Sequence, residues 1–264
     1  MAAAPPPGGP APPAPPAPPA PPAPPAPPEL FLSFDCATKT FAFCVCRVAL
    51  GRLPALRRRA RALRLGLARA QREGALAAAV GPAAAAAEAL AADLRGALWV
   101  ADGETADLAP GRPDAEVHTV ERLRAVAAYV ARRVRPAVAA ARRPGEPLRV
   151  LIEYQMGANA RARYVAAALV ALFADEPDIA FVAPSLKCRV AVCPEGAYHL
   201  FAARYASSYG ANKAHALFNF AEVERVFGSG APPCPPALRG HIADSFMQVL
   251  GHLLYGPADG AARF

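Results

Sequence analysis

The chain has 264 residues and lacks the features that mark several common protein classes. No apolar run reaches the roughly 18 residues that a membrane span needs. The Ala-rich stretch 74–96 comes closest, but Glu88 and Asp93 interrupt it. The first residues also lack the basic segment and the Leu-rich core of a secretory signal. These absences predict a soluble, intracellular protein that is not secreted and has no membrane partner.

Cysteine is present but lacks the spacing of a metal or redox site. The six cysteines form no CxxC pair, and no group of Cys and His residues has zinc-site spacing. The pattern predicts reduced thiols rather than disulfides or a structural zinc. Cys36, Cys44 and Cys46 lie in or beside strand-like sequence, where cysteine acts as a small apolar residue.

Lysine is scarce, so arginine supplies nearly all of the positive charge. The chain has 29 Lys and Arg against 21 Asp and Glu, a formal net charge of +8. The guanidinium fork suits phosphate oxygens, and a basic excess favours a polyanionic partner without naming one. A GC-rich coding sequence would enrich Arg, Ala and Pro together, so the charge is modest support for a nucleic-acid partner.

The two ends of the chain differ in composition from its middle. Residues 1–28 are almost entirely Pro, Ala and Gly, which predicts a disordered, extended tail. A docking site for a proline-binding partner is the alternative for this tail. Residues 29–256 are long enough for one α/β domain, and residues 257–264 form a short C-terminal tail.

Hydrophobic patterning predicts five strands, at residues 30–34, 41–48, 97–101, 148–152 and 179–183. The first two are joined tightly and predict a hairpin, and Asp102-Gly103 is expected to end the third. Helices are predicted at residues 114–135, 159–173, 212–227 and 238–255, with Pro136 kinking or ending the first. The Arg/Ala-rich stretch 51–96 has poor periodicity and is predicted to be an insertion, partly helical and partly disordered. The order of elements predicts an α/β fold with a mixed β-sheet, a β-meander plus βαβ units, flanked by helices.

Acidic residues recur at special places in this pattern. Asp35 ends the first strand, Glu153 ends the fourth, and Asp244 lies near the start of the last helix. His241 precedes Asp244 by three residues, so both lie on one face of that helix. Taken singly, each has a plainer explanation as a turn, cap or surface residue. As a set, they predict carboxylates that converge at one end of the sheet.

Three carboxylates in one pocket repel one another unless a cation holds them. Oxygen ligands suit Mg²⁺, for which Mn²⁺ can substitute. Two such ions per active site would serve phosphodiester hydrolysis, one activating water and the other stabilising the leaving oxygen. His241 could bind a metal or relay a proton, and the sequence leaves both roles open.

Four segments resemble the motifs of RuvC-like Holliday-junction resolvases of large DNA viruses, such as poxviruses and iridoviruses, within the RNase H-like superfamily. They are residues 32–43 (LSFDCATKTFAF), 150–155 (VLIEYQ), 181–185 (FVAPS) and 241–246 (HIADSF). The chain departs from the family pattern where Ala37 replaces the usual Gly, Thr40 the usual Asn, and His241 an acidic residue. The insertion and the Pro-rich tail match no part of the family.

The resemblance implies an RNase H-like nuclease domain and an Mg²⁺-dependent endonuclease that resolves four-way DNA junctions by paired symmetric nicks, acting in recombination and repair in a virus factory or nucleus. It implies a homodimer, which suits a substrate with two-fold symmetry. The implied catalytic and metal residues are Asp35, Glu153, His241 and Asp244. The expected DNA contacts are Lys39, Arg161, Arg163, Lys187, Arg189 and Lys213.

Other features are weaker candidates for contacts to DNA. A basic helix face from Arg122 to Arg135 could contact phosphates or simply be solvated. Tyr154, Tyr205 and Tyr209 could stack on bases or pack in the core. Two other functions remain open: an RNase H-like nuclease acting on RNA–DNA hybrids or flaps, and a catalytically inactive DNA-binding scaffold.

Overall fold

A five-stranded mixed β-sheet forms the centre of the protein. The computed structural model describes residues 27–36, 40–154, 159–187, 189–190, 210, 214, 216, 221 and 236–256. The strands lie in the order β3-β2-β1-β4-β5. Their bounds are Glu29–Cys36 for β1, Thr40–Val48 for β2, Leu98–Asp107 for β3, Leu148–Glu153 for β4 and Asp178–Val182 for β5. Strands β1 to β3 pair antiparallel as a meander, and β4 and β5 join in parallel. The predicted α/β class is confirmed, with a mixed sheet made of a meander and βαβ units and flanked by helices.

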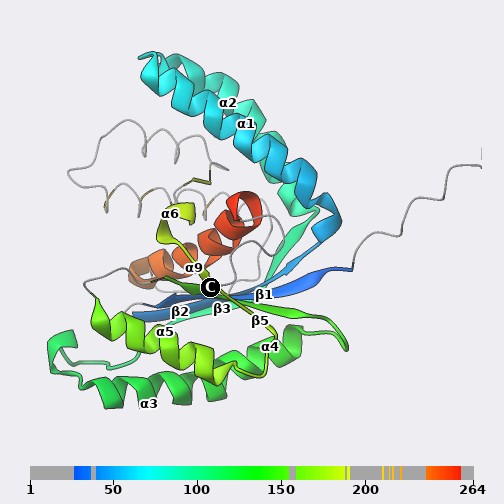
Figure 1. Cartoon of the computed structure of the whole chain (residues 1–264). Helices are drawn as coiled ribbons and strands as arrows, with labels where there is room; N and C mark the ends of the chain where they lie inside the picture. Colours follow the sequence, from blue (N-terminus) through cyan, green and yellow to red (C-terminus); the bar gives the residue numbers. More distant parts are fainter. Residues whose placement is uncertain are drawn as a thin grey trace, which may run out of the picture.

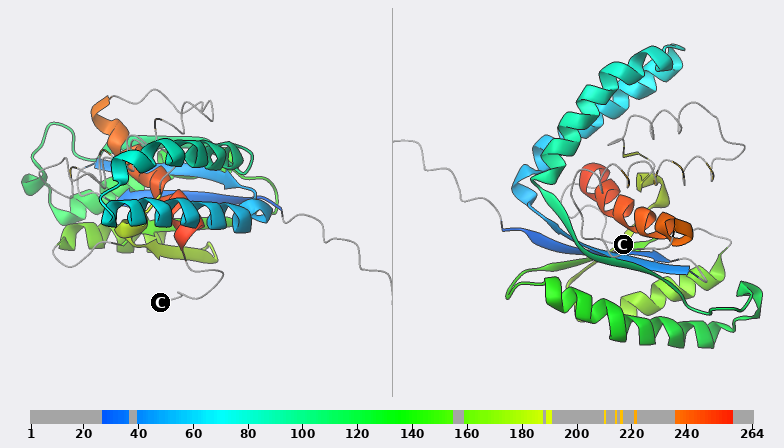
Figure 2. Two further views of the ribbon diagram at one scale, coloured as in Figure 1. Left: turned by 90° about the horizontal axis from the view of Figure 1, so that it is seen from above. Right: turned by 180° about the vertical axis from the view of Figure 1, so that it is seen from behind.

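Helices cover both faces of the sheet. Figure 1 shows α9 and α6 on one face and α3, α4 and α5 on the other, and the reverse view in Figure 2 agrees. The α-helices are α1 Leu53–Arg72, α2 Leu76–Arg95, α3 Thr119–Tyr129, α4 Arg135–Ala141, α5 Ala160–Leu172, α6 Pro184–Lys187 and α9 Pro236–Tyr255. None of these described helices is both long and apolar enough to cross a bilayer.

The alternation of side chains along the strands creates two separate cores. Phe31 of β1 and Leu151 of β4 pack with α9, whereas Leu32, Phe34 and Ile152 pack against α3, α4 and α5. Because successive side chains of a strand point to opposite faces, Asp35 shares the face of Phe31, and Glu153 shares the face of Leu151. Both carboxylates therefore lie on the face that α9 covers.

Strand β3 is longer than predicted. It continues through Asp102 and Gly103 to Asp107, where the sequence suggested a stop. The register with β2 shifts between Val45 and Cys46, so a bulge accommodates the extra residue. Gly103 fits beside β2 because a Cβ there would lie 3.1 Å from the Phe43 carbonyl oxygen. The glycine is thus a site of close strand packing rather than a turn.

The prediction of partial disorder in the stretch 51–96 is wrong. This stretch forms two 20-residue helices, α1 and α2, which Figure 1 shows as a hairpin rising from the sheet. The periodicity is regular once alanine counts as apolar: the buried residues of α1 are Leu56, Ala60, Leu63, Leu67 and Ala70. Gly74, with φ of +67°, makes the turn between the helices.

The helix predicted at residues 114–135 begins later than predicted, at Thr119, where His118 caps it, and Pro136 does not end it. The chain runs from α3 through a π-helical turn, Val130–Val134, directly into α4. Proline lacks an amide proton and its ring clashes with the carbonyl four residues earlier. The wider π-turn precedes Pro136, which then falls in the first turn of α4, where proline is tolerated.

The predicted basic face of this helix is largely engaged within the protein. Arg122 is 1% exposed and donates to the Asp114 carboxylate at 2.8 Å, so its placement on a solvated face is wrong. Arg133 forms ion pairs with Asp102 and Glu104 of β3. These arginines hold the helix to its neighbours and are not available for phosphate.

Two other predictions concern the C-terminal half. Asn159 caps α5 as expected, accepting a hydrogen bond from the Ala162 amide at 3.2 Å. The helix predicted at residues 212–227 and the N-terminal tail predicted at residues 1–28 lie almost wholly outside the described residues, and the C-terminal tail predicted at residues 257–264 lies wholly outside them.

Candidate catalytic and metal site

The strand register places two carboxylates side by side. Strands β1 and β4 are parallel neighbours, and Phe34 pairs with Ile152. The next residue on each strand is Asp35 or Glu153, and both are buried, with 5% and 7% of their surface exposed. Parallel strands carry their carboxyl ends to one edge of the sheet, so this pairing follows from the topology.

Helix α9 brings a polar stripe across this edge. His241, Asp244 and Gln248 follow one another at spacings of three and four, so they share a face of the helix. Asp35, His241 and Asp244 each offer one ligand atom, and these three atoms lie within 4.8 Å of one another. The apolar residues beside this stripe, such as Phe246, pack on the sheet and fix the helix in place.

Both ring nitrogens of His241 have partners. Nδ1 lies 2.9 Å from Asp35 Oδ2, and Nε2 lies 3.0 Å from Thr40 Oγ1. Thr40 and His241 are two of the positions at which the sequence departs from the resolvase motifs, and they contact each other. The imidazole is therefore oriented by strand β1 on one side and strand β2 on the other.

Lys187 is the cation of the cluster. Its Nζ lies 2.9 Å from Glu153 Oε1 and 3.5 Å from Asp244 Oδ1. It reaches the site from the short helix α6, which packs closely on α9 at Gly251. A Cβ at Gly251 would lie 2.8 Å from the Leu186 carbonyl and 2.9 Å from the Lys187 amide nitrogen. Only a residue without a side chain allows this approach, so Gly251 helps to position Lys187.

Gln248 ties the two carboxylate-bearing strands together. It is 1% exposed, and its side-chain nitrogen donates to the Phe34 carbonyl at 3.2 Å. Its side-chain oxygen accepts from the Glu153 amide at 2.8 Å. One helical side chain therefore satisfies backbone groups at the ends of both β1 and β4.

Burial controls the protonation of the cluster. Removal from water raises the pKa of Glu153; Lys187 opposes this rise and Asp35 adds to it, giving a value of about 7. For Lys187, burial alone would lower the pKa, but Glu153, Asp244 and Asp35 together raise it above its ordinary value. The ammonium therefore stays charged at neutral pH, while Glu153 is poised to take or release a proton.

The donor set fits a hard divalent cation. Asp35 and Asp244 supply carboxylate oxygens and His241 an imidazole nitrogen, a combination that suits Mn²⁺ and, through its oxygens, Mg²⁺. Asp35 and Asp244 lie in a buried site, where a divalent cation would offset the repulsion between their carboxylates. The residues present therefore match the metal that the sequence analysis predicts.

Three features of the cluster were not predicted from the sequence. Thr40 and Gln248 were not identified as site residues, and Lys187 was expected on a DNA-binding surface rather than between Glu153 and Asp244. Gln248 was detectable in principle, because it continues the His241 and Asp244 stripe inside an otherwise apolar helix face. The contact of Thr40 with His241 joins residues 201 positions apart, so no local pattern reveals it.

The predicted DNA contacts are scattered around the site. Arg163 and Arg189 are exposed, and Arg161 is half-exposed, donating to the Asp114 carbonyl at 3.2 Å. Tyr154 is 53% exposed and packs edge-on against Phe181. Four further predicted residues lie outside the described residues: Lys39, Tyr205, Tyr209 and Lys213.

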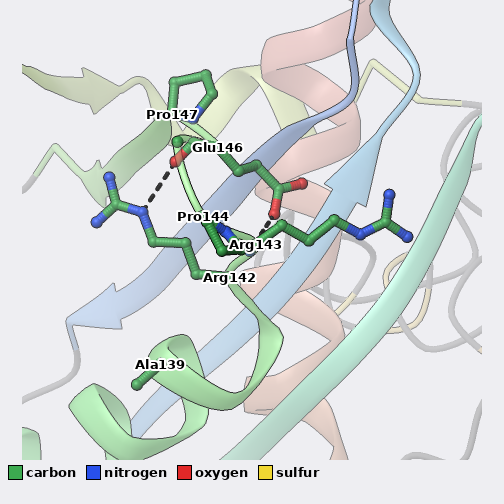
Figure 3. A pocket seen from close by; sticks show the side chains of 7 residues that line it. Ala139, Arg142, Arg143, Pro144, Glu146 and Pro147 are labelled. Atoms are coloured by element: carbon green, nitrogen blue, oxygen red, sulfur yellow. Dashed lines mark hydrogen bonds between the residues drawn. The ribbon is translucent and has the colours of Figure 1, made fainter.

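A hollow of about 480 Å³ lies at the other end of β4. Figure 3 shows its lining, the loop before β4, where Arg142 donates to the Glu146 carbonyl and the Arg143 amide to the Glu146 carboxylate. Glu146 also forms an ion pair with Arg47 at 2.7 Å. These groups satisfy one another, and the hollow is separated from the carboxylate cluster by the length of the strand.

No family model matches the sequence, and no curated protein matches it. Its structure is similar to that of "T. thermophilus RuvC in complex with Holliday junction substrate", with 13% sequence identity and a TM-score of 0.43. The similarity covers 86% of this chain and 94% of that chain. A likeness at this level does not establish function, which depends on the geometry of the site.

Proposed function

We propose that this protein is a divalent-metal-dependent endonuclease that cuts branched DNA, resolving four-way junctions. The observation that carries the proposal is the convergence of Asp35, His241 and Asp244 within 4.8 Å, with Glu153 beside them. Three carboxylates, an imidazole and a lysine, brought from two strands and two helices, have no evident structural purpose there. Clustered buried acids are costly to fold unless they hold a cation.

Each residue has a distinct task in the proposed reaction. Asp35, His241 and Asp244 would hold the divalent cation, which when bound supplies charge neutralisation at the scissile phosphate and a more acidic water. Glu153, with its pKa near 7, can accept a proton from a water molecule that attacks the phosphate. Lys187, 2.9 Å from Glu153, adds a positive charge that favours a phosphate at the same place. Thr40 and Gln248 orient His241 and the strand ends.

Three parts of the proposal go beyond the site. The presence of two ions per active site stays a prediction, because a second ion would need an oxygen of Glu153, which already pairs with Lys187. Paired nicks on a two-fold symmetric junction require two active sites, so a homodimer is the expected form. Arg161, Arg163 and Arg189 remain the expected phosphate contacts near the site. The viral type of resolvase likewise remains a prediction from the sequence motifs.

A cleavage assay tests the proposal. Four-way junctions, flaps, nicked duplex and RNA–DNA hybrids are incubated with the protein in Mg²⁺ or Mn²⁺. The unaltered protein is expected to cut the junction by paired symmetric nicks, and Asp35→Asn to bind the junction without cutting it. Asp178→Asn is a matched control, because Asp178 is at the opposite end of the sheet and pairs with Arg149 there.

The outcomes separate the alternatives. Preferential cutting of hybrids or flaps would assign the site to a different nuclease substrate. Junction binding without cleavage in either metal would indicate a scaffold and contradict the catalytic proposal. Equal loss in Asp35→Asn and Asp178→Asn would show that the effect is not specific to the cluster.

A further inference from the structure

The helical hairpin α1–α2 carries most of the net charge of the protein. Residues 50–96 contain nine arginines and only three acidic residues, a net charge of +6 out of the +8 of the whole chain. The hairpin replaces what would otherwise be a short turn between β2 and β3. The packing of α1 against α2 does not require this excess of arginine, so the positive charge of the hairpin calls for another explanation.

Four of the seven arginines of α1 lie on a single face. At 100° per residue, Arg58, Arg61, Arg69 and Arg72 fall within an arc of about 80°. All four are exposed, and the arc lies opposite the buried stripe that packs on α2. Arg69 pairs with Glu73 on the surface, and no ion pair joins the other three to a described residue. We call these four residues the α1 stripe.

The base of the hairpin is fixed to the body of the protein. Arg57 donates to the Leu253 carbonyl at 2.7 Å, and the Tyr255 hydroxyl donates to the Ala60 carbonyl at 3.0 Å. The guanidinium of Arg64 lies 5.8 Å from the centre of the Tyr255 ring. These contacts join α1 to the C-terminal end of α9, so the hairpin is a braced arm rather than a loose loop.

The stripe is remote from the carboxylate cluster but on the same side of the sheet. Eleven residues of α9 separate Asp244 from Tyr255, which is about 16 Å along the helix. Each helix of the hairpin has 20 residues, about 30 Å long. Figures 1 and 2 show the hairpin rising on the face of the sheet that α9 covers.

We infer that the hairpin α1–α2 is a second nucleic-acid-binding element, whose α1 stripe contacts the phosphate backbone of duplex DNA away from the scissile bond. A straight row of exposed guanidiniums matches the linear charge of a duplex, which presents one phosphate per 3.4 Å of each strand. No base-reading groups accompany the stripe, because the other exposed residues of this arc are Pro54 and Leu65. The contact is therefore independent of DNA sequence.

The test measures binding of the full chain carrying Asp35→Asn to a 40-base-pair duplex over a range of salt concentrations. In one variant, Arg58, Arg61, Arg69 and Arg72 are all replaced by Ala. A matched control replaces four exposed arginines on or near the opposite helices: Arg112, Arg124, Arg132 and Arg143. The stripe variant is expected to lower the log–log salt slope by about 3 to 4 and to weaken binding at least about tenfold near 0.1 M salt. The control is expected to change the slope by less than about 1.

Two further measurements make the test decisive. Replacing the same four stripe residues by Lys keeps the charge and is expected to retain the slope, provided each variant keeps the thermal stability of the parent. Equal losses in the stripe and control variants would mean that only net charge matters and would overturn the inference. Binding to phosphatidylserine-containing vesicles but not to DNA would also overturn it.

The contribution of the stripe to junction cutting rests on the proposed function, but duplex binding does not. On junctions with arms of about 25 base pairs, the stripe variant is expected to lose affinity. On arms of about 8 base pairs, roughly 27 Å long, the loss is expected to be smaller, because such an arm passes only the end of the stripe nearest Tyr255. If the protein binds duplex through the stripe but cuts none of the substrates, the proposed nuclease function is refuted and the hairpin inference stands. If the stripe variant cuts junctions as well as the parent at both arm lengths, the hairpin inference is refuted and the nuclease function stands.

Discussion

The protein concentrates charge in two places that follow opposite rules. At the carboxyl ends of β1 and β4, a few acidic groups are buried, and Asp35 and Asp244 expose 5% and 3% of their surface. On the hairpin α1–α2, eight arginines lie on the two helices and most of them are exposed. One cluster is small, negative and desolvated, whereas the other is large, positive and hydrated.

This difference determines what each charge can contribute. In a buried cluster, each group interacts strongly with its neighbours, so the loss of one changes the protonation and metal affinity of all. On an exposed helix, each charge interacts weakly and is screened by salt, so the effects are small and nearly additive. Buried charges suit chemistry at one point, and exposed charges suit attraction along a length of polyanion.

The largest effect is expected from Asp244→Asn. Asp244 belongs to the group that could hold a cation and lies 3.5 Å from Lys187 Nζ. Its replacement is expected to reduce junction cleavage at least about 100-fold and to abolish the rise in melting temperature that Mn²⁺ gives the unaltered protein. Metal titrations followed by thermal unfolding and cleavage rates measure both effects.

The matched control makes the same chemical change on the hairpin. Asp93 is an exposed partner of Arg59, so Asp93→Asn is expected to leave the Mn²⁺ response intact and the stability within about 0.5 kcal/mol. If both variants lost the metal response alike, the distinction between buried and exposed charge would not hold.

A smaller effect is expected in the pH dependence of metal-free stability. The pKa of Glu153 is about 7 in the folded protein, above its ordinary 4.5, chiefly because it is buried. The folded state therefore holds a proton that the unfolded state lacks between these values. The resulting stabilisation is fully present below pH 4.5 and is lost as the pH rises through 7, about 3 kcal/mol in all. In EDTA, Glu153→Gln should remove this loss, so the variant should be the more stable protein at pH 8.

The pKa of Glu146 is shifted in the opposite direction from that of Glu153. Its hydrogen bond with Arg47 lowers its pKa although it is also buried. Its stabilising contribution is present above pH 4.5 and is lost as the pH falls through its lowered pKa. Glu146→Gln should therefore destabilise the protein at neutral pH. If the stabilities of Glu146→Gln and Glu153→Gln, each relative to the unaltered protein, changed with pH in the same direction, the opposite directions given for the two pKa shifts would be wrong.

The sequence predicted the centre of the fold well and its periphery poorly. The strands around Asp35 and Glu153 are short, apolar and sharply ended, so their existence and order were readable. The hairpin was not, because its core uses Ala60, Ala70, Ala83 and Ala87 as packing residues. Alanine is too common in this chain for its spacing to be noticed by hydrophobicity alone.

The same contrast applies to the site. Asp35, Glu153, His241 and Asp244 were predicted because each stands at a marked position of a strand or helix. Their catalytic and metal roles remain predictions, whereas their proximity is observed. The place of Lys187 depends on the packing of α6 against Gly251, a tertiary contact with no local signature. Arg122 was misplaced because helical spacing does not reveal that a buried guanidinium finds Asp114.

The smallest effect is expected from a single residue of the α1 stripe. Arg58 is exposed and forms no ion pair with a described residue, so Arg58→Ala should change the free energy of unfolding by less than about 0.5 kcal/mol. Its loss should nevertheless lower the salt slope of duplex binding by about 0.9, one phosphate contact, and weaken binding only a few-fold.

Arg122→Ala is expected to show the reverse pattern. This substitution removes the ion-pair partner of the Asp114 carboxylate and creates a cavity, so it should lower the free energy of unfolding by about 3 kcal/mol with no change in the salt slope. Unfolding by denaturant and salt titration on the same two proteins measure both quantities. A large stability loss for Arg58→Ala, or a slope change for Arg122→Ala, would show that burial does not separate the structural arginines from those that bind DNA.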